Sequence, residues 1–401
     1  MRIEDRFFLK NECTGCFACS NACPMKCISM KSDPSGFMIP QIEHSTCISC
    51  RMCEITCPTL TPVKLFEESA HVYVAWAKDE TIRIQSTSGG IFPILAEEVL
   101  KQGGIVTGVA FDAEGVLRHF FADKIEDIVP FKGSKYVQST PGDIYLKIKT
   151  YLAQGRKVLF TSTPCQVAAL KAVVKEHENL IVCDLLCFGV PSNKLFREYL
   201  SCVKDALGEI GTPDYNSFMF RNTELSTGNR LSRIKFKNGK EYKLCNNLNN
   251  FLEIFHSGVA LRNSCYTCRY QTTKRVGDLT IGDFWGLGER KKFKHSTIKG
   301  SSIVILNSTV GYLLFDKVKD RLFYERRNLT EGKRGNALRQ LKRRVSSSDD
   351  FYESLNGKNI LLVDNWKHKR PFLVRFFSFV KRAFCKLFWY FFRQINFFDY
   401  Y

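Results

Sequence analysis

Eight cysteines near the amino terminus constrain this 401-residue chain more than any other feature. The segment "CTGCFACSNACP" covers residues 13 to 24, and "CISCRMCEITCP" covers residues 47 to 58. Both have the spacing C-x2-C-x2-C-x3-C-P. Two-residue spacers let the backbone turn tightly enough for three thiolates to surround one iron-sulfur cube. The repeat therefore predicts two [4Fe-4S] clusters.

The same spacing resembles bacterial two-cluster ferredoxins, in which the fourth cysteine of each run binds the other cluster. By this resemblance, Cys57 completes the cluster of the first run, and Cys23 completes the cluster of the second. We call the two expected ligand groups the first set, Cys13, Cys16, Cys19 and Cys57, and the second set, Cys47, Cys50, Cys53 and Cys23. Cys27 has no place in this pattern, and we expect a small buried thiol there.

Zinc is the alternative metal, because pairs of cysteines separated by two residues also bind zinc. A zinc site needs neither the third cysteine of each run nor the x3-C-P ending, so the pattern favours iron-sulfur clusters. The 17 cysteines of the chain would indicate disulfides only in a short secreted protein, and no signal peptide is evident. We therefore expect the protein to lie in the reducing cytoplasm, where its thiols stay available as metal ligands.

Beyond residue 70, short apolar runs alternate with segments of helical periodicity. "HVYVAWAK", "IVTGVAFD" and "HFFAD" are typical of strands, and "IFPILAEEVLKQGG" predicts a helix that stops at Gly103 and Gly104. "RKVLFTSTPCQVAALKAVV" predicts a strand, a turn and a helix, and "NLIVCDLLCFGVPS" predicts a further strand. This alternation indicates an α/β body.

Two stretches of this body have the composition of phosphate-binding or flavin-binding loops. The glycine loop precedes a predicted helix, whose first N–H groups and dipole suit an anion, and its residues are Ser88, Gly89 and Gly90. The lysine loop, residues 131 to 139, offers cations for phosphates and a ring for stacking, through Lys132, Gly133, Ser134, Lys135 and Tyr136. Ordinary turn chemistry and a solvated surface turn are the alternatives for these two loops.

Four further cysteines lie at predicted loop positions. Cys165 lies where a strand meets a helix, Cys187 ends the following strand, and Cys265 and Cys268 form a CxxC pair. Since α/β folds bind ligands at the carboxyl ends of their strands, this third set is a candidate for a third [4Fe-4S] cluster. The alternative is that Cys165 and Cys187 are ordinary buried thiols.

Taken together, these motifs resemble the beta subunits of coenzyme F420-reducing hydrogenases and F420-dependent dehydrogenases. The shared motifs, in order over residues 70 to 310, are SxSGG, KGSKYV, TPCQ, a later cysteine, and CxxC followed by GDxTIGDFWG. The resemblance implies one FAD, a [4Fe-4S] cluster held by the third set, and electron transfer between cluster, flavin and the deazaflavin F420. Similar ferredoxin-fused chains occur beside genes for polysaccharide assembly, so another organic acceptor is the alternative to F420.

The expected fold class is an α+β ferredoxin-like two-cluster domain, an α/β flavin and iron-sulfur domain, and a C-terminal amphipathic helix. The expected boundaries are residues 1–62 for the ferredoxin domain, 70–150 and 151–325 for the N-terminal and C-terminal regions of the beta-subunit body, 326–365 for a basic connector, and 366–401 for an amphipathic aromatic and basic tail.

The expected function is an oxidoreductase that converts single electrons to pairs, since clusters carry one electron at a time and flavin can release two as a hydride. The expected donor is a ferredoxin or another low-potential redox protein. The alternatives are an electron-transfer subunit that feeds a partner enzyme without its own substrate site, and clusters that serve structure or sensing. No Ser-His-Asp or histidine-metal spacing indicates another chemistry, so we name no catalytic residue.

The tail carries much of the net charge of +19, with 8 Lys or Arg against 1 Asp in residues 366–401. At helical spacing, its basic residues form a narrow stripe on an aromatic helix, namely Arg375, Arg382, Lys386 and Arg393. The longest uncharged run is far shorter than the ~20 residues that a membrane span needs. We expect a cytoplasmic protein whose tail lies on the anionic inner face of a membrane. The alternatives are packing against a partner subunit or against the protein itself, and nucleic acid is not an expected partner.

Overall fold

The computed structural model describes residues 12–223, 230–339, 349–355 and 358–362 of the chain. The described residues belong to the first of two units, Met1–Leu362. The tail predicted for residues 366–401 lies outside the described residues, and the connector predicted for residues 326–365 is described only in part.

An eight-stranded sheet, in the order β13-β3-β12-β11-β7-β6-β4-β5, forms the centre of the first unit. Its neighbouring strands β4, β6, β7 and β11 are parallel, and all other pairs are antiparallel. The strands are β3 (Val72–Ala77), β4 (Ile105–Phe111), β5 (Leu117–Ala122), β6 (Val158–Ser162), β7 (Leu180–Leu185), β11 (Leu279–Asp283), β12 (Ser302–Leu306) and β13 (Leu322–Arg327). The predicted α/β body is therefore confirmed, with a mixed sheet at its centre.

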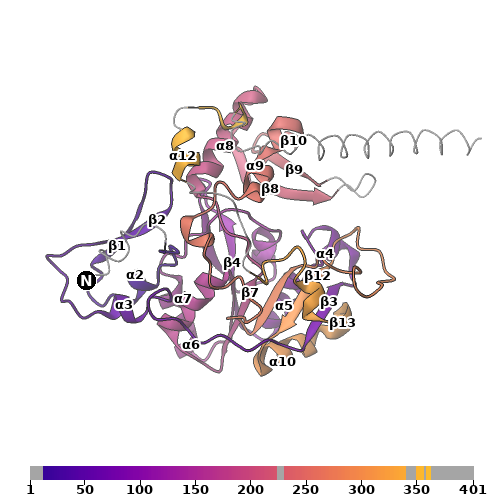
Figure 1. Cartoon of the computed structure of the whole chain (residues 1–401), viewed down its shortest axis with the longest axis horizontal. Coiled ribbons are helices and arrows are strands. Elements are labelled where there is room, and N and C mark those ends of the chain that lie inside the picture. Colours follow the sequence, from indigo (N-terminus) through magenta and orange to yellow (C-terminus); the bar gives the residue numbers. More distant parts are fainter. Residues whose placement is uncertain (1–11, 224–229, 340–348, 356–357, 363–401) are drawn as a thin grey trace, which may run out of the picture. The chain divides into compact units, whose positions relative to one another are not determined.

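Helices cover both faces of this sheet, which explains the continuous apolar runs of its central strands. Leu159 of β6 and Ile181 of β7 face one buried cluster, whereas the next residues, Phe160 and Val182, face another. The first cluster is completed by α5 (Ile91–Lys101) and α10 (Thr309–Val318), and the second by α6 (Ile144–Ala153) and α7 (Pro164–Val174). Figure 1 shows these two helical layers.

Helix α5 begins and ends where the sequence indicates. Gly90 is its N-cap, with a left-handed φ of 77°, and the helix closes at Lys101. Gly103, with a φ of 73°, and Gly104 donate backbone hydrogen bonds to the last turn, to Leu100 O and Val99 O. Glycine adopts this left-handed conformation without the steric penalty of a Cβ, so the glycine pair stops the helix.

A second, smaller sheet lies within the body, and no pattern in the sequence marks it as a separate element. Its order is β10-β9-β8, all antiparallel, with β8 (Pro213–Thr223), β9 (Arg230–Phe236) and β10 (Glu241–Leu244). The other elements of the body are α4 (Glu80–Ile84), α8 (Asn193–Ala206), α9 (Asn250–Ser257), α11 (Leu329–Gly332), α12 (Asp349–Ser354), and the 3-10 helices η1 (Glu126–Phe131), η2 (Asn246–Asn249), η3 (Asn263–Cys265), η4 (Lys319–Arg321) and η5 (Ile360–Leu362).

The cysteine-repeat region, residues 12–60, forms a hairpin of β1 (Ile28–Ser32) and β2 (Met38–Ile42) with two short helices, α2 (Ala18–Ala22) and α3 (Met52–Ile55). The two cysteine runs share an unusual backbone. Gly15 and Phe17 of the first run have φ of 60° and 66°, and the matching Ser49 and Arg51 of the second have 55° and 59°. Left-handed non-glycine residues are strained and gather at functional sites. The repeated spacing thus folds into a repeated turn.

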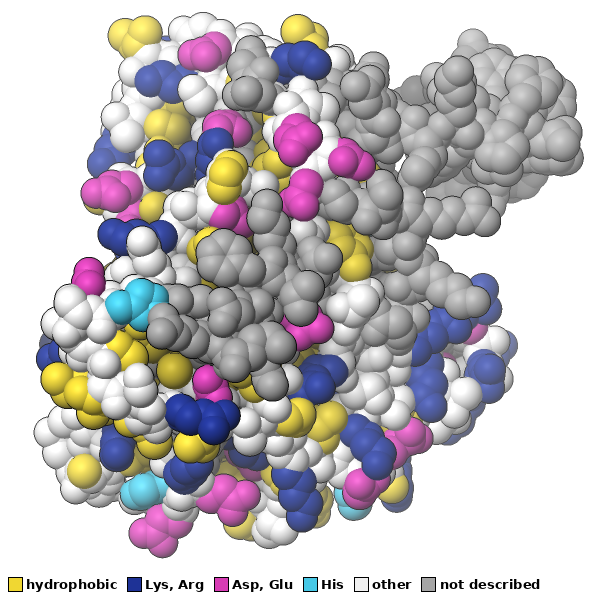
Figure 2. Space-filling model, turned by 60° about the vertical axis from the view of Figure 1, so that its left-hand side comes forward, with side chains coloured by type: hydrophobic (Ala, Val, Ile, Leu, Met, Phe, Trp, Pro, Cys, Tyr) yellow, Lys and Arg dark blue, Asp and Glu magenta, His cyan; other side chains and the backbone are white. Residues whose placement is uncertain are grey.

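The cysteine-repeat region packs directly on the body. Cys16, Phe17 and Ala18 belong to the same buried cluster as α6 and α7, in which Tyr145 is fully buried. Figure 2 brings this end of the molecule forward, and on this face Lys and Arg side chains are interspersed with Asp and Glu. Among the described helices, none is long and apolar enough to cross a membrane.

We expect His119 to weaken the protein in acid. Burial lowers its pKa from 6.5 to about 4, so the unfolded state takes up a proton first. The contribution of His119 to the free energy of unfolding is therefore present above pH 6.5 and is lost as the pH falls towards 4. Between pH 7 and pH 5 this loss is about 2 kcal/mol. Urea unfolding of wild type and His119→Gln at both pH values measures this loss.

The replacement should remove that part of the pH dependence, because glutamine does not titrate and can still donate a hydrogen bond to Ser162, 3.1 Å from the ring. Replacement of the exposed His177 by glutamine is the matched control. An equal loss of stability with acid in the wild type and His119→Gln would contradict the prediction.

Candidate functional site

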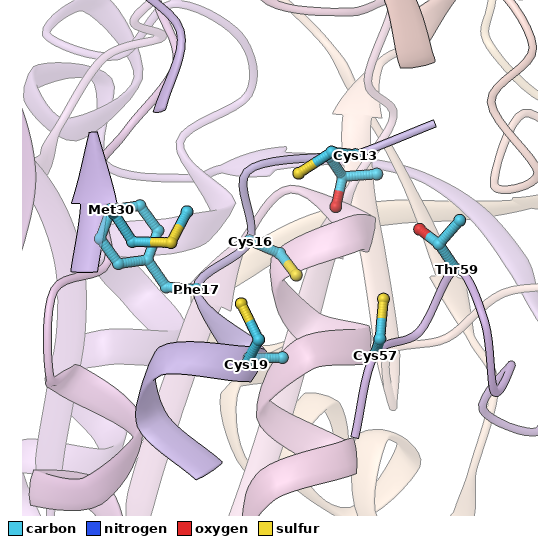
Figure 3. A pocket seen from close by; sticks show the side chains of 9 residues that line it. Cys13, Cys16, Phe17, Cys19, Met30, Cys57 and Thr59 are labelled. Carbon is cyan, nitrogen blue, oxygen red and sulfur yellow. The ribbon is translucent and has the colours of Figure 1, made fainter. Parts of the chain in front are cut away.

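The first set of cysteines lines one pocket. The pocket is lined by the four cysteines of the set, Cys13, Cys16, Cys19 and Cys57. Its other lining residues are Thr14, Phe17, Ala18, Met30 and Thr59. Figure 3 shows the sulfur atoms of Cys16, Cys19 and Cys57 turned towards a common space next to Cys13. Four thiols around an apolar pocket are the donor set that an iron-sulfur cube needs, so these residues fit the group.

Burial favours the protonated form of the buried thiols of this pocket, Cys16, Cys19 and Cys57. Burial, followed by the nearby Cys57 and Cys13 thiolates, raises the pKa of Cys16 to about 12. Burial, followed by the charges of Cys16, Cys13 and Cys57, holds the pKa of Cys19 well above its usual range. Metal ligands must be deprotonated, so loading this site releases protons. The N–H of Gly15 lies 3.4 Å from the Cys13 sulfur and can stabilise a ligating thiolate.

The second set lies closer to the surface than the first. Cys50 is exposed and its three partners are half-buried, whereas Cys16, Cys19 and Cys57 are buried. Cys23, Cys47 and Cys53 pack around the buried Cys27 in one small apolar cluster. The Cys23 and Cys27 sulfurs are 3.3 Å apart, so the additional thiol touches a predicted ligand.

The third set converges at the carboxyl edge of the large sheet. Cys165 lies in the first turn of α7, Cys187 follows β7, Cys265 ends η3, and Cys268 lies three residues further on. Burial and then the charges of Cys265, Cys165 and Cys268 hold the pKa of Cys187 well above its usual range. Burial is also the main reason that the pKa of Cys165 rises to about 12, with Cys268 and Cys265 contributing. Each thiol thus lies within electrostatic reach of the others.

The first and third sets share one buried cluster. Cys16 belongs to it, and Cys165 and Cys268 pack against it. The Tyr145 hydroxyl donates a 2.8 Å hydrogen bond to the Cys16 carbonyl. Burial and then the charges of Cys165 and Cys16 raise the pKa of Tyr270, so this ring lies near both sets. Two tyrosines therefore lie near both groups of thiols.

A buried ion pair fixes the chain between the CxxC pair and β11. Asp184 and Arg275 are both fully buried, and their charged groups are 3.0 Å apart. Asp184 also accepts hydrogen bonds from the N–H groups of Val276 and Gly277, at 3.1 and 3.0 Å. A Cβ on Gly277 would lie 2.7 Å from the Asp184 nitrogen, which explains a glycine there. Removing one partner of such a pair costs about 3 to 5 kcal/mol.

The TPCQ glutamine connects the Cys165 turn to the end of the lysine loop. The Gln166 amide oxygen accepts from Ser139 Oγ at 3.0 Å and from Thr163 Oγ1 at 3.2 Å, and also from Ser162 Oγ. Its nitrogen donates to Ser139 O at 2.8 Å. Because Gln166 is buried, these bonds hold the first turn of α7 against the end of the lysine loop.

The glycine loop and the lysine loop touch each other. The N–H of Ser134 donates a 2.7 Å hydrogen bond to Thr87 Oγ1, and Ser88 Oγ donates to Ser301 O at 3.0 Å. The α5 amino terminus that follows has no side-chain cap among the described residues, so its amides can donate to a phosphate. Lys135 is turned inward, with Nζ 2.8 Å from Lys132 O, and burial lowers its pKa to about 7. The loops therefore fit a phosphate-bearing group mainly through backbone amides.

Arg221 joins the small sheet to the carboxyl edge of the large one. Its guanidinium lies 2.6 Å from the Asp283 carboxylate at the end of β11, and 5.6 Å from the ring centres of Tyr136 and Trp285. Its side chain is buried, and its Nε has no partner among the described residues. Trp285 is 41% exposed. A cation and two aromatic rings thus meet beside the lysine loop.

Sequence reasoning missed Arg262, Gln138, Tyr145 and Arg221. Gln138 lies in the lysine loop but was not among its expected binding residues, and the other three belong to no predicted motif. Each of the four contacts a segment remote along the chain. The only local signal is the position of Arg262, three residues before Cys265. Within the described part of the chain, no three His, Cys, Asp or Glu side chains are placed to hold a single metal ion.

Comparison with known families matches almost the whole described body. The C-terminal part of "Coenzyme F420 hydrogenase/dehydrogenase, beta subunit" matches residues 155–331, and the N-terminal part matches residues 72–146. A 4Fe-4S dicluster domain matches residues 12–60. The dicluster match supports iron-sulfur clusters in the cysteine-repeat region and not zinc.

Among solved structures, the chain is similar to one from a study of xenon derivatization of the F420-reducing [NiFe] hydrogenase complex from Methanosarcina barkeri. The two are 18% identical with a TM-score of 0.44, over 74% of this chain and 90% of that one. No curated protein sequence matches the chain.

We expect Gly89→Ala to destabilise the glycine loop. A Cβ there would lie 2.4 Å from Ala75 O and 2.9 Å from Ser302 N, and both are backbone atoms of central strands. The loop must move, at a cost of about 1 to 3 kcal/mol. Gly103→Ala is the control, since its Cβ would meet nothing within 4 Å and only its positive φ of 73° opposes the change. Denaturant unfolding measures the free energy of unfolding of both variants. An equal loss of stability in the two variants would contradict the prediction.

Proposed function

Because the chain belongs to the coenzyme F420 hydrogenase/dehydrogenase beta subunit family and carries a 4Fe-4S dicluster domain, we propose that it is an iron-sulfur flavoprotein oxidoreductase. In this proposal, electrons pass between ferredoxin-type clusters and FAD to reduce F420 or another organic acceptor, such as an intermediate of polysaccharide biosynthesis. The observation that carries the proposal is the packing of the first and third sets in one buried cluster.

The packing of the three sets gives the proposed order of electron transfer. The second set, with the exposed Cys50, faces the donor, a ferredoxin or another low-potential redox protein. The first set packs on the body through Cys16, and the half-buried third set lies at the carboxyl edge of the large sheet, against the same cluster as Tyr145 and Tyr270. When bound, the clusters carry single electrons, and the flavin accumulates two for hydride release. The protein's own residues exclude water and hold the sites in place.

The flavin is proposed to bind at the carboxyl edge of the large sheet. The glycine loop and the lysine loop meet there, through Thr87 and Ser134, and the α5 amino terminus offers amides for a phosphate. The acceptor is proposed to approach from the side of Arg221 and Trp285, where a cation lies beside an exposed ring. Amides, hydroxyls and a guanidinium can tune a flavin without acting as acid or base.

The alternative function is an electron-transfer subunit that passes electrons to a partner enzyme and has no substrate site of its own. The observation that favours it is that the matching family is one of beta subunits, which are components of a larger enzyme. A stoichiometric protein partner together with no reduction of F420 would support this alternative. The cytoplasmic location and the anionic membrane surface for the tail remain predictions.

The first test is the content of iron, acid-labile sulfide and flavin after anaerobic purification of the full chain. Three cubes correspond to about 12 irons per chain, and we expect one flavin. Cys165→Ser should reduce the iron content to about 8, because a cube that loses one of its four thiolates is not retained. Cys202→Ser is the control, since this half-buried thiol of α8 belongs to none of the three sets.

An iron content of about 8 without flavin in the reconstituted wild type would overturn the proposal. Residues 70 to 310 would then keep the family's fold without its redox centres. If iron and flavin are both present, anaerobic mixing of the reduced protein with F420 tests the acceptor, because reduction removes the deazaflavin absorbance. No change in that absorbance would leave another organic acceptor or the partner enzyme as the recipient.

A further inference from the structure

The geometry points to Arg262 as the residue that couples the first and third sets, both in position and in electrostatic potential. This inference rests on the proposed function, since it takes both sets to be cluster ligands. Arg262 is a positioning residue, because it contacts the backbone of the ligand loops and not the thiols themselves. Neither the cysteine spacing nor the family motifs include it.

The guanidinium of Arg262 holds the cysteine-repeat region. Its Nε donates to Cys13 O at 2.6 Å, and its Nη2 donates to Met38 O at 3.0 Å. Its charged carbon also lies 5.3 Å from the ring centre of Phe37. One side chain therefore binds the first ligand of the first set and the β2 strand that begins at Met38. Hydrogen bonds from a charged donor are about twice as strong as neutral ones.

The backbone of Arg262 holds the third set. Its carbonyl accepts a 2.8 Å hydrogen bond from the N–H of Cys265, and its own N–H donates to Val190 O at 2.9 Å. Val190 lies three residues after Cys187, so both bonds fix segments that carry thiols of the third set. A single residue thus links the ligand loops of the two sites, although Arg262 and Cys13 are 249 residues apart in sequence.

Gln138 and Gly15 pack closely around the Arg262 guanidinium. Gln138 accepts from Arg262 Nη1 at 3.1 Å and donates to Thr14 O at 2.9 Å, which adds a second bridge to the Cys13 loop. A Cβ on Gly15 would lie 2.6 Å from Arg262 Nη1. Because Gly15 also has a left-handed φ of 60°, only glycine suits both the turn and the approach of the guanidinium.

The charge of Arg262 has no carboxylate partner within the described residues, although the residue is only 4% exposed. Buried charges are normally paired, because burial without compensation is costly. A cluster held by four thiolates is an anion, and reduction makes it more negative. Two such anions beside Arg262 would supply the missing compensation.

The expected effect on the redox chemistry follows from this charge. A cation stabilises the reduced form of each cluster, so it raises both reduction potentials. Transfer between clusters held by the two sets would oxidise the first by one electron and reduce the third by one electron, and no proton would be required. The guanidinium of Arg262 contacts the Cys13 loop, and its charge also acts on Cys165 of the third set. It therefore raises both potentials and changes their difference little.

Arg262→Gln tests the inference in the full chain, by a redox titration monitored by electron paramagnetic resonance. At a fixed potential, we expect the ratio of reduced to oxidised cluster to fall about tenfold at both inner sites, which corresponds to 59 mV for a one-electron couple. Arg262→Lys keeps the charge and should shift both ratios much less. Arg156→Gln is the control, because Arg156 also donates to backbone carbonyls, Gly103 O and Gly104 O, but at the opposite edge of the sheet.

Unchanged potentials in an Arg262→Gln protein with the wild-type iron content would overturn the inference. If that variant does not retain its iron, Gln138→Glu replaces it, since a carboxylate at Arg262 Nη1 offsets the same charge at nearly the same volume. Its potentials should fall as well, and unchanged potentials would again overturn the inference. Failure of the proposed function is distinguishable, because it appears in the wild type as missing iron or flavin.

Discussion

The packing of the first cysteine loop into the core of the α/β body is the constraint on which the other features depend. Cys16, Phe17 and Ala18 are buried with α6 and α7, and the Tyr145 hydroxyl is satisfied by the Cys16 carbonyl. A buried hydroxyl left without its partner costs about 1 to 3 kcal/mol. The cysteine-repeat region is therefore held in one orientation on the body, which an electron path between fixed sites requires.

Local sequence patterns predicted the local structure well. The repeated spacing of the cysteines produces the repeated left-handed turn at Gly15 and Phe17, and at Ser49 and Arg51. The buried runs "VLFTS" and "LIVCDL" form neighbouring central strands, because a strand covered on both faces needs apolar residues at successive positions. The position of the third set at the carboxyl edge follows from the same strand-to-helix order.

Contacts between remote segments could not be predicted in the same way. The small sheet of β8, β9 and β10 resembles any other strand pattern in sequence. Its links to the body join remote residues, such as Arg221 with Asp283 and Asn216 with Phe111. Arg262 contacts Cys13 across 249 positions, and Gln138 contacts Thr14 across 124. A single arginine or glutamine has no periodicity, so only the folded arrangement shows what it holds.

The acidic residues of the GDLTIGD segment stabilise the fold instead of acting as acids or bases. Asp278 accepts from Val182 N at 2.9 Å and from Ser308 Oγ at 2.6 Å, and Asp283 pairs with Arg221. Because these groups already have partners, the described carboxyl edge offers thiols, backbone amides and guanidinium groups for chemistry. Such a site suits electron transfer, in which the protein sets positions and potentials and the bound groups carry the electrons.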